Sequence, residues 1–281
     1  MNLFNIIDEI EKFDPELNDR LNPRRAAIKN ITSFGSKVAM AAVPFAMGTM
    51  LKRAYGAAAA PTVVEVLNYA LTLEYLESSF YNTGAASAGL IPAAGASYIN
   101  TVKDDENQHV AFLKTAITAS GGTPVTSPKF DFTAGGGTGE GPFKGLFGNY
   151  NLFLKVALAF EDTGVRAYKG QAPNLLGNKD ILTAALSIHA VEARHASAIR
   201  QLLGVSPWIT STATLGNDTG VPQVNGNYDG EQNVTQGGVN LTTLPGVSGT
   251  STSVAVATAA FDEPLSMDQV LALLVGTFIY T

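Results

Sequence analysis

Four stretches of the chain carry apolar residues at the alternating three- and four-residue spacing of an amphipathic helix. They cover residues 62–81, 97–119, 151–169 and 178–203. The first begins at Thr62, with Glu65 in capping-box register, and the last two stop at Gly170 and Gly204. The pattern therefore predicts four long helices.

The links between these stretches predict how the helices pair. The first and second are joined by a short link, as are the third and fourth, which is typical of antiparallel hairpins. Residues 123–148 contain three prolines and the run Gly135-Gly136-Gly137, so this segment is not expected to be helical, but it is long enough to cross a bundle. We therefore predict an all-α fold, a four-helix bundle over residues 61–204 with a long crossover between its second and third helices.

The C-terminal part, residues 205–281, has a different composition. Residues 205–260 are rich in Gly, Asn, Thr and Val and carry few charges, which indicates loops and short strands folded over one end of the bundle. A last apolar piece starts at Pro264, with Ser266 and Gln269 in capping-box register, and runs to about Val275. We expect an irregular extension that ends in a short packing helix.

Residues 1–60 follow the order of an export signal. Arg24 and Arg25 precede an uncharged run at residues 38–50, and small residues fill 54–60. The arginine pair resembles a twin-arginine signal, which predicts export to the periplasm or cell envelope and a mature chain from about residue 61. The alternative is an amphipathic helix with a surface arginine pair. No later segment has 18 consecutive apolar residues, so no transmembrane helix is expected in the mature domain.

The amino-acid composition excludes several kinds of partner and of catalytic or metal site. The chain has 281 residues, a net charge of −6 and no dense basic stripe, which argues against a nucleic-acid partner. It has no cysteine, so thiol nucleophiles, cysteine-bound zinc and cysteine-bound iron–sulfur clusters are excluded. Only three histidines are present. Histidine and carboxylate chemistry is what remains.

Several acidic side chains fall on the apolar faces of the predicted helices. Glu106 and His109 project from the apolar side of the second helix, and Glu192 and His195 from that of the fourth. Glu161 lies on the apolar arc of the third helix, whose polar edge is formed by Lys155, Asp162, Arg166 and Lys169. Glu74 and Glu77 share the inward side of the first. Because an unpartnered buried carboxylate costs several kcal/mol, something should neutralise these groups.

The spacing of these residues indicates a repeated half. Glu74, Tyr81, Glu106 and His109 are separated by 7, 25 and 3 residues, and their counterparts in the second half by 7, 24 and 3. Two such hairpins packed about a pseudo-two-fold axis would bring four glutamates and two histidines to one point, which is the ligand set of a dinuclear metal site. The predicted metal ligands are Glu74, Glu106, His109, Glu161, Glu192 and His195.

Some assignments stay open on the sequence alone. Glu77 could replace Glu74 as a ligand or lie just behind the ligands, and Gly164 occupies its place in the second half. Tyr81 and Tyr168 are either hydrogen-bond donors to the ligands or core aromatics. His189 lies at the edge of the apolar arc and is interpreted as a non-ligand. A charge-paired core without metal is the alternative to the whole site.

The pattern resembles the ferritin-like superfamily, and with the leading arginine pair it is similar to exported bacterial ferritin-like domain proteins. The resemblance covers about residues 62–203 through Leu73-Glu74-Tyr75-Leu76-Glu77, Glu106-Asn107-Gln108-His109, Phe160-Glu161-Asp162 and Glu192-Ala193-Arg194-His195. It implies a di-iron or di-manganese centre in a family of iron stores, ferroxidases, peroxidases, catalases and oxygenases. The fold does not select among these reactions.

Carboxylate and imidazole ligands without sulfur suit iron or manganese. The leading hypothesis is an exported protein with two iron ions, manganese being the alternative, that reacts with oxygen or peroxide or oxidises iron. The rival hypothesis is a structural or stress-related envelope protein whose metal is structural or absent. An open coordination position would separate the two, because a structural metal site is closed. The sequence identifies no protein partner.

Overall fold

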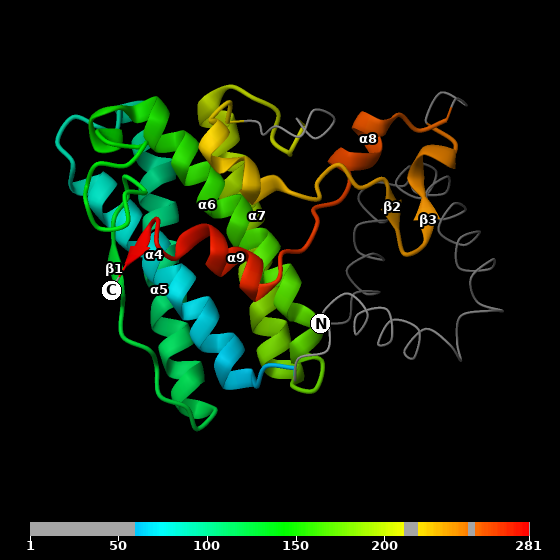
Figure 1. The fold of residues 1–281 in the computed structure, drawn as a ribbon, viewed down its shortest axis with the longest axis horizontal. Coiled ribbons are helices and arrows are strands. Elements are labelled where there is room, and N and C mark those ends of the chain that lie inside the picture. The colour runs from blue at the N-terminus through cyan, green and yellow to red at the C-terminus, as the bar shows by residue number, and fades with distance from the viewer. Residues whose placement is uncertain (1–59, 211–218, 247–250, 281) are drawn as a thin grey trace, which may run out of the picture. The chain divides into compact units, whose positions relative to one another are not determined.

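The chain folds around an antiparallel four-helix bundle (Figure 1). The structure is a computed structural model, and it describes residues 60–210, 219–246 and 251–280. The bundle helices, labelled as in Figure 1, are α4 (Val63–Ala86), α5 (Ala93–Ala119), α6 (Tyr150–Gln171) and α7 (Lys179–Leu203). As predicted, α4 pairs with α5 and α6 with α7, and across the two hairpins α4 faces α6 while α5 faces α7. The all-α bundle with a long crossover is confirmed.

Side-chain caps start three of the four helices. Thr62 and Glu65 form the predicted capping box at α4, while Asn149 and Asn178 accept hydrogen bonds from the first turns of α6 and α7. Gly204, with a φ of 71°, ends α7 in the left-handed conformation that glycine adopts without strain. Local sequence signals therefore set most of the helix ends.

Three helix ends differ from the sequence prediction. Helix α4 continues five residues past Tyr81, because Asn82 and Thr83 bond back to carbonyls one turn earlier and Gly84 packs beneath the ring of Phe153. Helix α5 starts at Ala93, directly after Pro92, without a side-chain cap. Helix α6 passes through Gly170 and ends at Gln171, since the missing Cβ leaves space for the carbonyl oxygen of Leu265.

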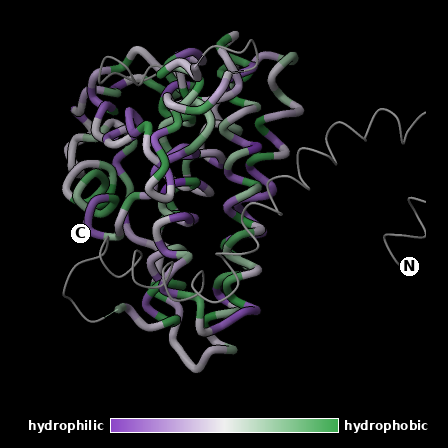
Figure 2. Tube along the Cα trace, turned by 90° about the vertical axis from the view of Figure 1, so that its right-hand side faces the viewer, coloured by the Kyte–Doolittle hydropathy of each residue, from purple (hydrophilic) through white to green (hydrophobic). Residues whose placement is uncertain are grey.

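The bundle core consists of two apolar clusters with a polar layer between them. Along α5, Ile99 and Val102 belong to one cluster, and Leu113 and Ile117 belong to the other. Glu106 and His109 lie in the turns between these pairs. Figure 2 shows hydrophobic and hydrophilic segments alternating along the helices. The polar layer is therefore enclosed by hydrocarbon at both ends.

The crossover between α5 and α6 runs beside α4. Asn68 of α4 donates to the carbonyl of Thr123 (3.2 Å) and accepts from the amide of Val125 (2.8 Å). Further on, β1 (Lys129–Phe130) pairs antiparallel with β4 (Ile279–Tyr280), which joins the crossover to the C-terminal end of the described chain. The carboxylate of Asp131 then organises the glycine-rich loop by accepting four hydrogen bonds, from Thr133, Gly137 and Gly139.

The C-terminal extension is mostly irregular, as predicted, and adds short elements around the bundle. They are η4 (Pro222–Tyr228), β2 (Thr235–Gln236), β3 (Val239–Asn240), η5 (Leu241–Thr243), α8 (Val254–Ala259) and α9 (Met267–Leu274). Outside the extension, η1 (Leu146–Gly148) precedes α6 and η2 (Ala172–Leu175) precedes α7. The turn between β2 and β3 is Gly237-Gly238, both with positive φ, which suits a two-residue hairpin. Helix α9 has the predicted Ser266/Gln269 capping box and packs on α6.

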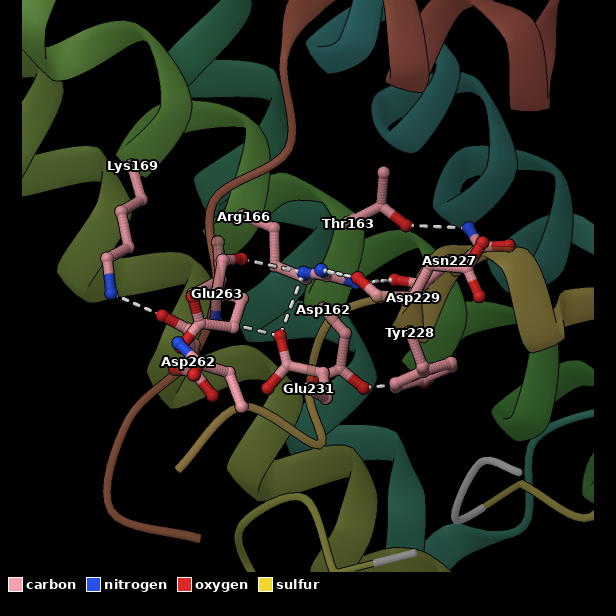
Figure 3. Close-up of polar contacts among 12 residues, drawn as sticks. Asp162, Thr163, Arg166, Lys169, Asn227, Tyr228, Asp229, Glu231, Asp262 and Glu263 are labelled. Atoms are coloured by element: carbon pink, nitrogen blue, oxygen red, sulfur yellow. Dashed lines mark hydrogen bonds and ion pairs between the residues drawn. The ribbon is translucent and has the colours of Figure 1, made fainter. Parts of the chain in front are cut away.

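A buried polar network joins the extension to α6 (Figure 3). The guanidinium of Arg166 donates to the carbonyls of Asn227, Asp229 and Glu263 and lies 2.9 Å from the carboxylate of Glu231. Its side chain is only 1% exposed. The polar edge of the third predicted helix is therefore covered by the extension.

A second part of this network centres on Asp162. Its carboxylate accepts two hydrogen bonds of 2.7 Å from Arg200 of α7 and one of 2.6 Å from the hydroxyl of Tyr228. The side chain of Asn227 also bonds to Thr163 (2.7 Å). Asp162 immediately follows Glu161, so the extension is attached directly behind one of the predicted metal ligands.

The predicted export signal and its cleavage zone lie outside the described residues. Within the described part of the chain, none of the helices is both long and apolar enough to span a bilayer.

Candidate metal centre

The four bundle helices bring all six predicted ligands into the polar layer. Glu74 comes from α4, Glu161 from α6, and the two Glu-x-x-His pairs from α5 and α7. All four glutamates are fully buried, at 0% exposure. The i, i+3 spacing places each glutamate one turn from its histidine on the same helix face, so both side chains reach the same point.

The six side chains form two groups of four. One group holds Glu74, Glu106, His109 and Glu192, and the other holds Glu106, Glu161, Glu192 and His195. Within each group the candidate ligand atoms all lie within 4.8 Å of one another. Glu106 and Glu192 belong to both groups, which is the arrangement expected of carboxylates that bridge two metal ions.

Distances around the histidines show how closely the donor atoms converge. Nδ1 of His109 lies 3.2 Å from Oε2 of Glu74, 3.2 Å from Oε2 of Glu106 and 3.3 Å from Oε1 of Glu192. Nδ1 of His195 lies 2.8 Å from Oε1 of Glu106 and 3.2 Å from Oε2 of Glu161. The two imidazole rings are 6.3 Å apart. Each histidine thus presents Nδ1 to the carboxylates.

Many of these buried atoms have no hydrogen-bond partner. They are Oε1 of Glu106, Oε2 of Glu161, both oxygens of Glu192 and Nδ1 of His195. Although Nδ1 of His195 is close to carboxylate oxygens, the atoms are not aligned as hydrogen bonds. Unpaired buried polar atoms are costly, so their convergence on one point fits a cation at that point better than a metal-free core.

Tyr81 and Tyr168 are hydrogen-bond donors, and each serves the opposite half of the repeat. The hydroxyl of Tyr81 on α4 donates to Glu161 on α6, and the hydroxyl of Tyr168 on α6 donates to Glu74 on α4. Both rings are buried. The tyrosines therefore hold the two glutamates that belong to only one group of four.

Glu77 and His189 lie outside both groups. Glu77 is buried close to Gly164, where an added Cβ would stand 3.3 Å from Oε1 of Glu77 and 3.2 Å from Oε2 of Glu192. Glu77 is therefore a neighbour of the shared Glu192, and Glu74 is the residue of α4 that joins the cluster. Nδ1 of His189 donates to the carbonyl of Val165 (2.9 Å), as expected of a non-ligand.

Burial and mutual repulsion dominate the electrostatics of the metal-free site. Burial, reinforced by the charge of Glu192, raises the pKa of Glu77 well above its usual range, and burial raises the pKa of Glu106 to about 8. Burial also raises the pKa of Glu192 strongly. For Glu74 the effect of burial is outweighed by hydrogen bonding to His109, so its pKa is lowered. Without metal, this site therefore retains protons at neutral pH.

Both histidines hold their protons strongly in the metal-free chain. Burial alone would lower the pKa of His195, but the charge of Glu161 and the contact with Glu106 raise it to about 12. The pKa of His109 is raised further for the same kind of reason. Protons on the histidines and carboxylates thus balance the buried charge until a cation displaces them.

Sequence reasoning missed Asp105. Its carboxylate on α5 lies 3.1 Å from Nε2 of His195 on α7, on the side of the ring opposite the cluster. Asp105 directly precedes Glu106, but its side chain is 43% exposed and nothing in the helical period distinguishes it from a surface aspartate. The Arg166 and Arg200 contacts were missed as well, because their partners lie far away in the sequence.

The part of the chain that forms the four-helix bundle matches a known protein family. A family model described as the ferritin-like domain matches residues 62–205, just over half of the chain. The chain belongs to this ferritin-like family. The ferritin-like domain thus spans the four bundle helices and stops where the extension begins. No curated protein matches the chain.

The ferritin-like domain of this chain therefore offers a buried set of oxygen and nitrogen donors that could hold a metal. It has the donor types that suit iron or manganese, and the described residues around it supply no sulfur ligand. The apolar clusters on either side keep the donors out of bulk water, which strengthens every charge interaction within the layer.

Proposed function

We propose that the ferritin-like domain binds two iron ions at Glu74, Glu106, His109, Glu161, Glu192 and His195, and that the centre carries out redox chemistry with oxygen or peroxide. The observation that carries the proposal is the pair of four-residue groups sharing Glu106 and Glu192, with unpaired buried oxygens and nitrogen aimed between them. Iron oxidation is included in this proposal, since the same donors would serve it.

The donor chemistry supports iron or manganese as the resident metal. Carboxylates and imidazoles tolerate both divalent and trivalent ions, whereas soft metals prefer sulfur. In each group of four, three carboxylates and one histidine would face one ion. Two bound ions would supply the electron-transfer chemistry, which no side chain of the cluster can provide by itself.

The residues around the donors have distinct parts in this proposal. Tyr81 and Tyr168 hold Glu161 and Glu74 in fixed orientations through hydrogen bonds from the facing helix. The two apolar clusters exclude water from the layer. Glu77, whose pKa is raised by burial and by the charge of Glu192, is a buried proton carrier beside the shared Glu192.

We propose that the protein works outside the cytoplasm. The support is the order of residues 1–60, in which the Arg24-Arg25 pair precedes an apolar run and a small-residue zone. A twin-arginine route is consistent with the bundle, because that route exports chains that have already folded around a cofactor.

The deciding experiment is the metal content of the full chain, purified without chelator and measured by plasma mass spectrometry. We expect two iron or manganese ions per chain, and loss of both in a Glu106→Ala/His195→Ala double variant, because Glu106 belongs to both groups. His189→Gln is the matched control, since it removes a histidine that is half-buried in α7 but outside the cluster. Circular dichroism would show whether each variant remains folded.

The result also separates the rival functions. Two ions with turnover of peroxide or oxygen would support the redox centre. Two tightly held ions without turnover would support a structural metal in an envelope protein. A chain that takes up no metal even after anaerobic loading with Fe(II) or Mn(II) would contradict the metal-binding proposal altogether.

A further inference from the structure

The two histidines of the candidate centre differ in the hydrogen-bond partner of Nε2, the ring nitrogen that faces away from the cluster. His195 presents Nδ1 to the cluster, while its other nitrogen, Nε2, lies 3.1 Å from Oδ2 of Asp105. The two residues come from different helices, α7 and α5, so the contact ties the helices together beside the cluster. For His109, no hydrogen bond at Nε2 is formed with any of the residues that the structure describes.

The repeated hairpins explain the difference. Asp105 directly precedes Glu106, and the equivalent residue before Glu192 is Val191. Valine has no acceptor, so the second half of the repeat cannot support His109 as the first half supports His195. The two overlapping groups of four donors are thus nearly related by symmetry, and Asp105 breaks this symmetry.

A carboxylate that accepts a hydrogen bond from the non-ligating ring nitrogen of a histidine is known to affect metal binding. It accepts the ring N–H, which fixes the proton on Nε2 and leaves the lone pair of Nδ1 facing the metal. It also makes that lone pair more basic, and removal of such a partner weakens metal binding by about 10- to 100-fold. Among the residues that the structure describes, His195 has such a carboxylate and His109 has none.

We infer that Asp105 is a positioning residue that makes the metal position at His195 bind its ion more tightly than the position at His109, so that the two positions fill in sequence. The inference rests on the proposed function, because it concerns the same centre. It adds an order of loading and a residue that sets this order.

The test is an anaerobic titration of the full, metal-free chain with Co(II), followed by visible absorption and by calorimetry. Co(II) replaces Fe(II) as a coloured probe that does not react with traces of oxygen as readily. We expect two separate binding steps in the wild type. His195→Ala should abolish the tighter step, and His109→Ala the weaker one.

Substitutions at Asp105 then test the cause of the inequality. Asp105→Ala should weaken the tighter step by about 10- to 100-fold. Asp105→Asn keeps an acceptor without the charge and should fall between Ala and the wild type, while Asp105→Glu should restore part of the loss. The matched control is Asp104→Ala, which removes the neighbouring carboxylate, an exposed partner of Lys103.

A second measurement excludes a merely structural effect. Nitrogen NMR of the histidine rings in the metal-free chain should show a shifted Nε2 resonance of His195 in Asp105→Ala, because the hydrogen bond to Asp105 is lost, and no shift in His109. The thermal unfolding temperatures of the metal-free variants should stay close to that of the wild type, since Asp105 contacts His195 from a partly exposed position.

The failure of the inference is distinguishable from the failure of the proposed function. Two equal binding steps in the wild type, or an unchanged tighter step in Asp105→Ala, would overturn the inference while the metal centre stands. A wild-type chain that binds no Co(II), Fe(II) or Mn(II) would overturn both.

Discussion

Five glutamates and two histidines share the polar layer of the bundle, and only six of these seven side chains form the two groups of four. Glu77 is the side chain left over. It is buried beside Glu192, and burial together with the charge of Glu192 raises its pKa. The site thus separates carboxylates that converge on a common point from one that is only a neighbour.

Substitution of Glu74 and of Glu77 should therefore have opposite results. Glu74→Gln should reduce the metal content from two ions to one or none, because it removes a donor from the His109 group. Glu77→Gln should keep two ions. Metal analysis of both variants after identical loading measures this difference, and loss of metal in Glu77→Gln alone would show that the ligand on α4 is misassigned.

Metal binding should strengthen as the pH rises. The pKa of Glu106 is raised to about 8 and those of Glu192 and the two histidines are raised as well, so the metal-free site is protonated at pH 6 to 8 and an ion must displace those protons. Affinity should rise about tenfold per pH unit for each proton released. Co(II) titrations at pH 6, 7 and 8 would measure the slope, and a flat profile would contradict it.

The convergence of the six side chains could be predicted at the residue level because each is an acidic or imidazole side chain on an apolar helix face, and because the spacing recurs. Asp105 could not, since its position on α5 is that of an ordinary surface aspartate. The sequence also could not predict that each tyrosine bonds to the glutamate of the other hairpin. Tyr81 lies two turns from Glu74 on its own helix, yet it bonds to Glu161, a contact that depends on how α4 faces α6.

At the scale of elements, glycines decide how closely helix and extension approach. Gly170 in α6 would place an added Cβ 1.9 Å from the carbonyl oxygen of Leu265, a backbone atom that cannot move without shifting the extension. Gly164 leaves room in the same helix for the carboxylates of Glu77 and Glu192. Helix α6 therefore uses two glycines for two separate close contacts.

Gly170→Ala should destabilise the protein even though alanine favours a helix by up to about 1 kcal/mol. The clash with Leu265 should cost about 1 to 3 kcal/mol, as overpacking of a core does, and should outweigh the helical gain. Denaturant unfolding measures the net change. Gly177→Ala, with nothing within 4 Å of the added Cβ, is the control and should change stability by less than about 1 kcal/mol. A stabilised Gly170→Ala would show that the extension is not held at this point.

Periodicity predicted the four helices and their pairing, but not where contacts with other segments extend them. Asn82-Thr83-Gly84 is a local stop signal, and α4 continues through it because Gly84 packs against Phe153, far along the chain. The pairing of β1 with β4 joins two-residue strands about 150 residues apart. Strands that short carry no alternation that a pattern could detect.

At the scale of the whole described molecule, the extension is fastened by buried charges. Arg166 holds three carbonyls of the extension and pairs with Glu231, and Arg200 pairs with Asp162 within the bundle. The sequence showed Asp162, Arg166 and Lys169 as the polar edge of a helix. It could not show that another segment covers this edge, because the partners are backbone carbonyls that no residue type identifies.

Arg166→Leu should loosen the extension. The change removes the cation that pairs with the buried Glu231, and breaking such a pair typically costs about 3 to 5 kcal/mol. Hydrogen exchange should then rise in residues 222–231 and 263–265, while α4 and α5 stay protected. Lys155→Leu on the same helix is the control. Unchanged exchange in Arg166→Leu would mean that apolar contacts alone hold the extension.

The crossed tyrosine contacts have a consequence for assembly. A single hairpin cut from the bundle would contain a phenol without its carboxylate and a carboxylate without its phenol, so each hairpin is complete only in the presence of the other. The crossover tethers the two and turns their meeting from a bimolecular encounter into an intramolecular one, at an effective concentration of the order of millimolar. The centre should consequently form to the same extent in dilute and in concentrated solution.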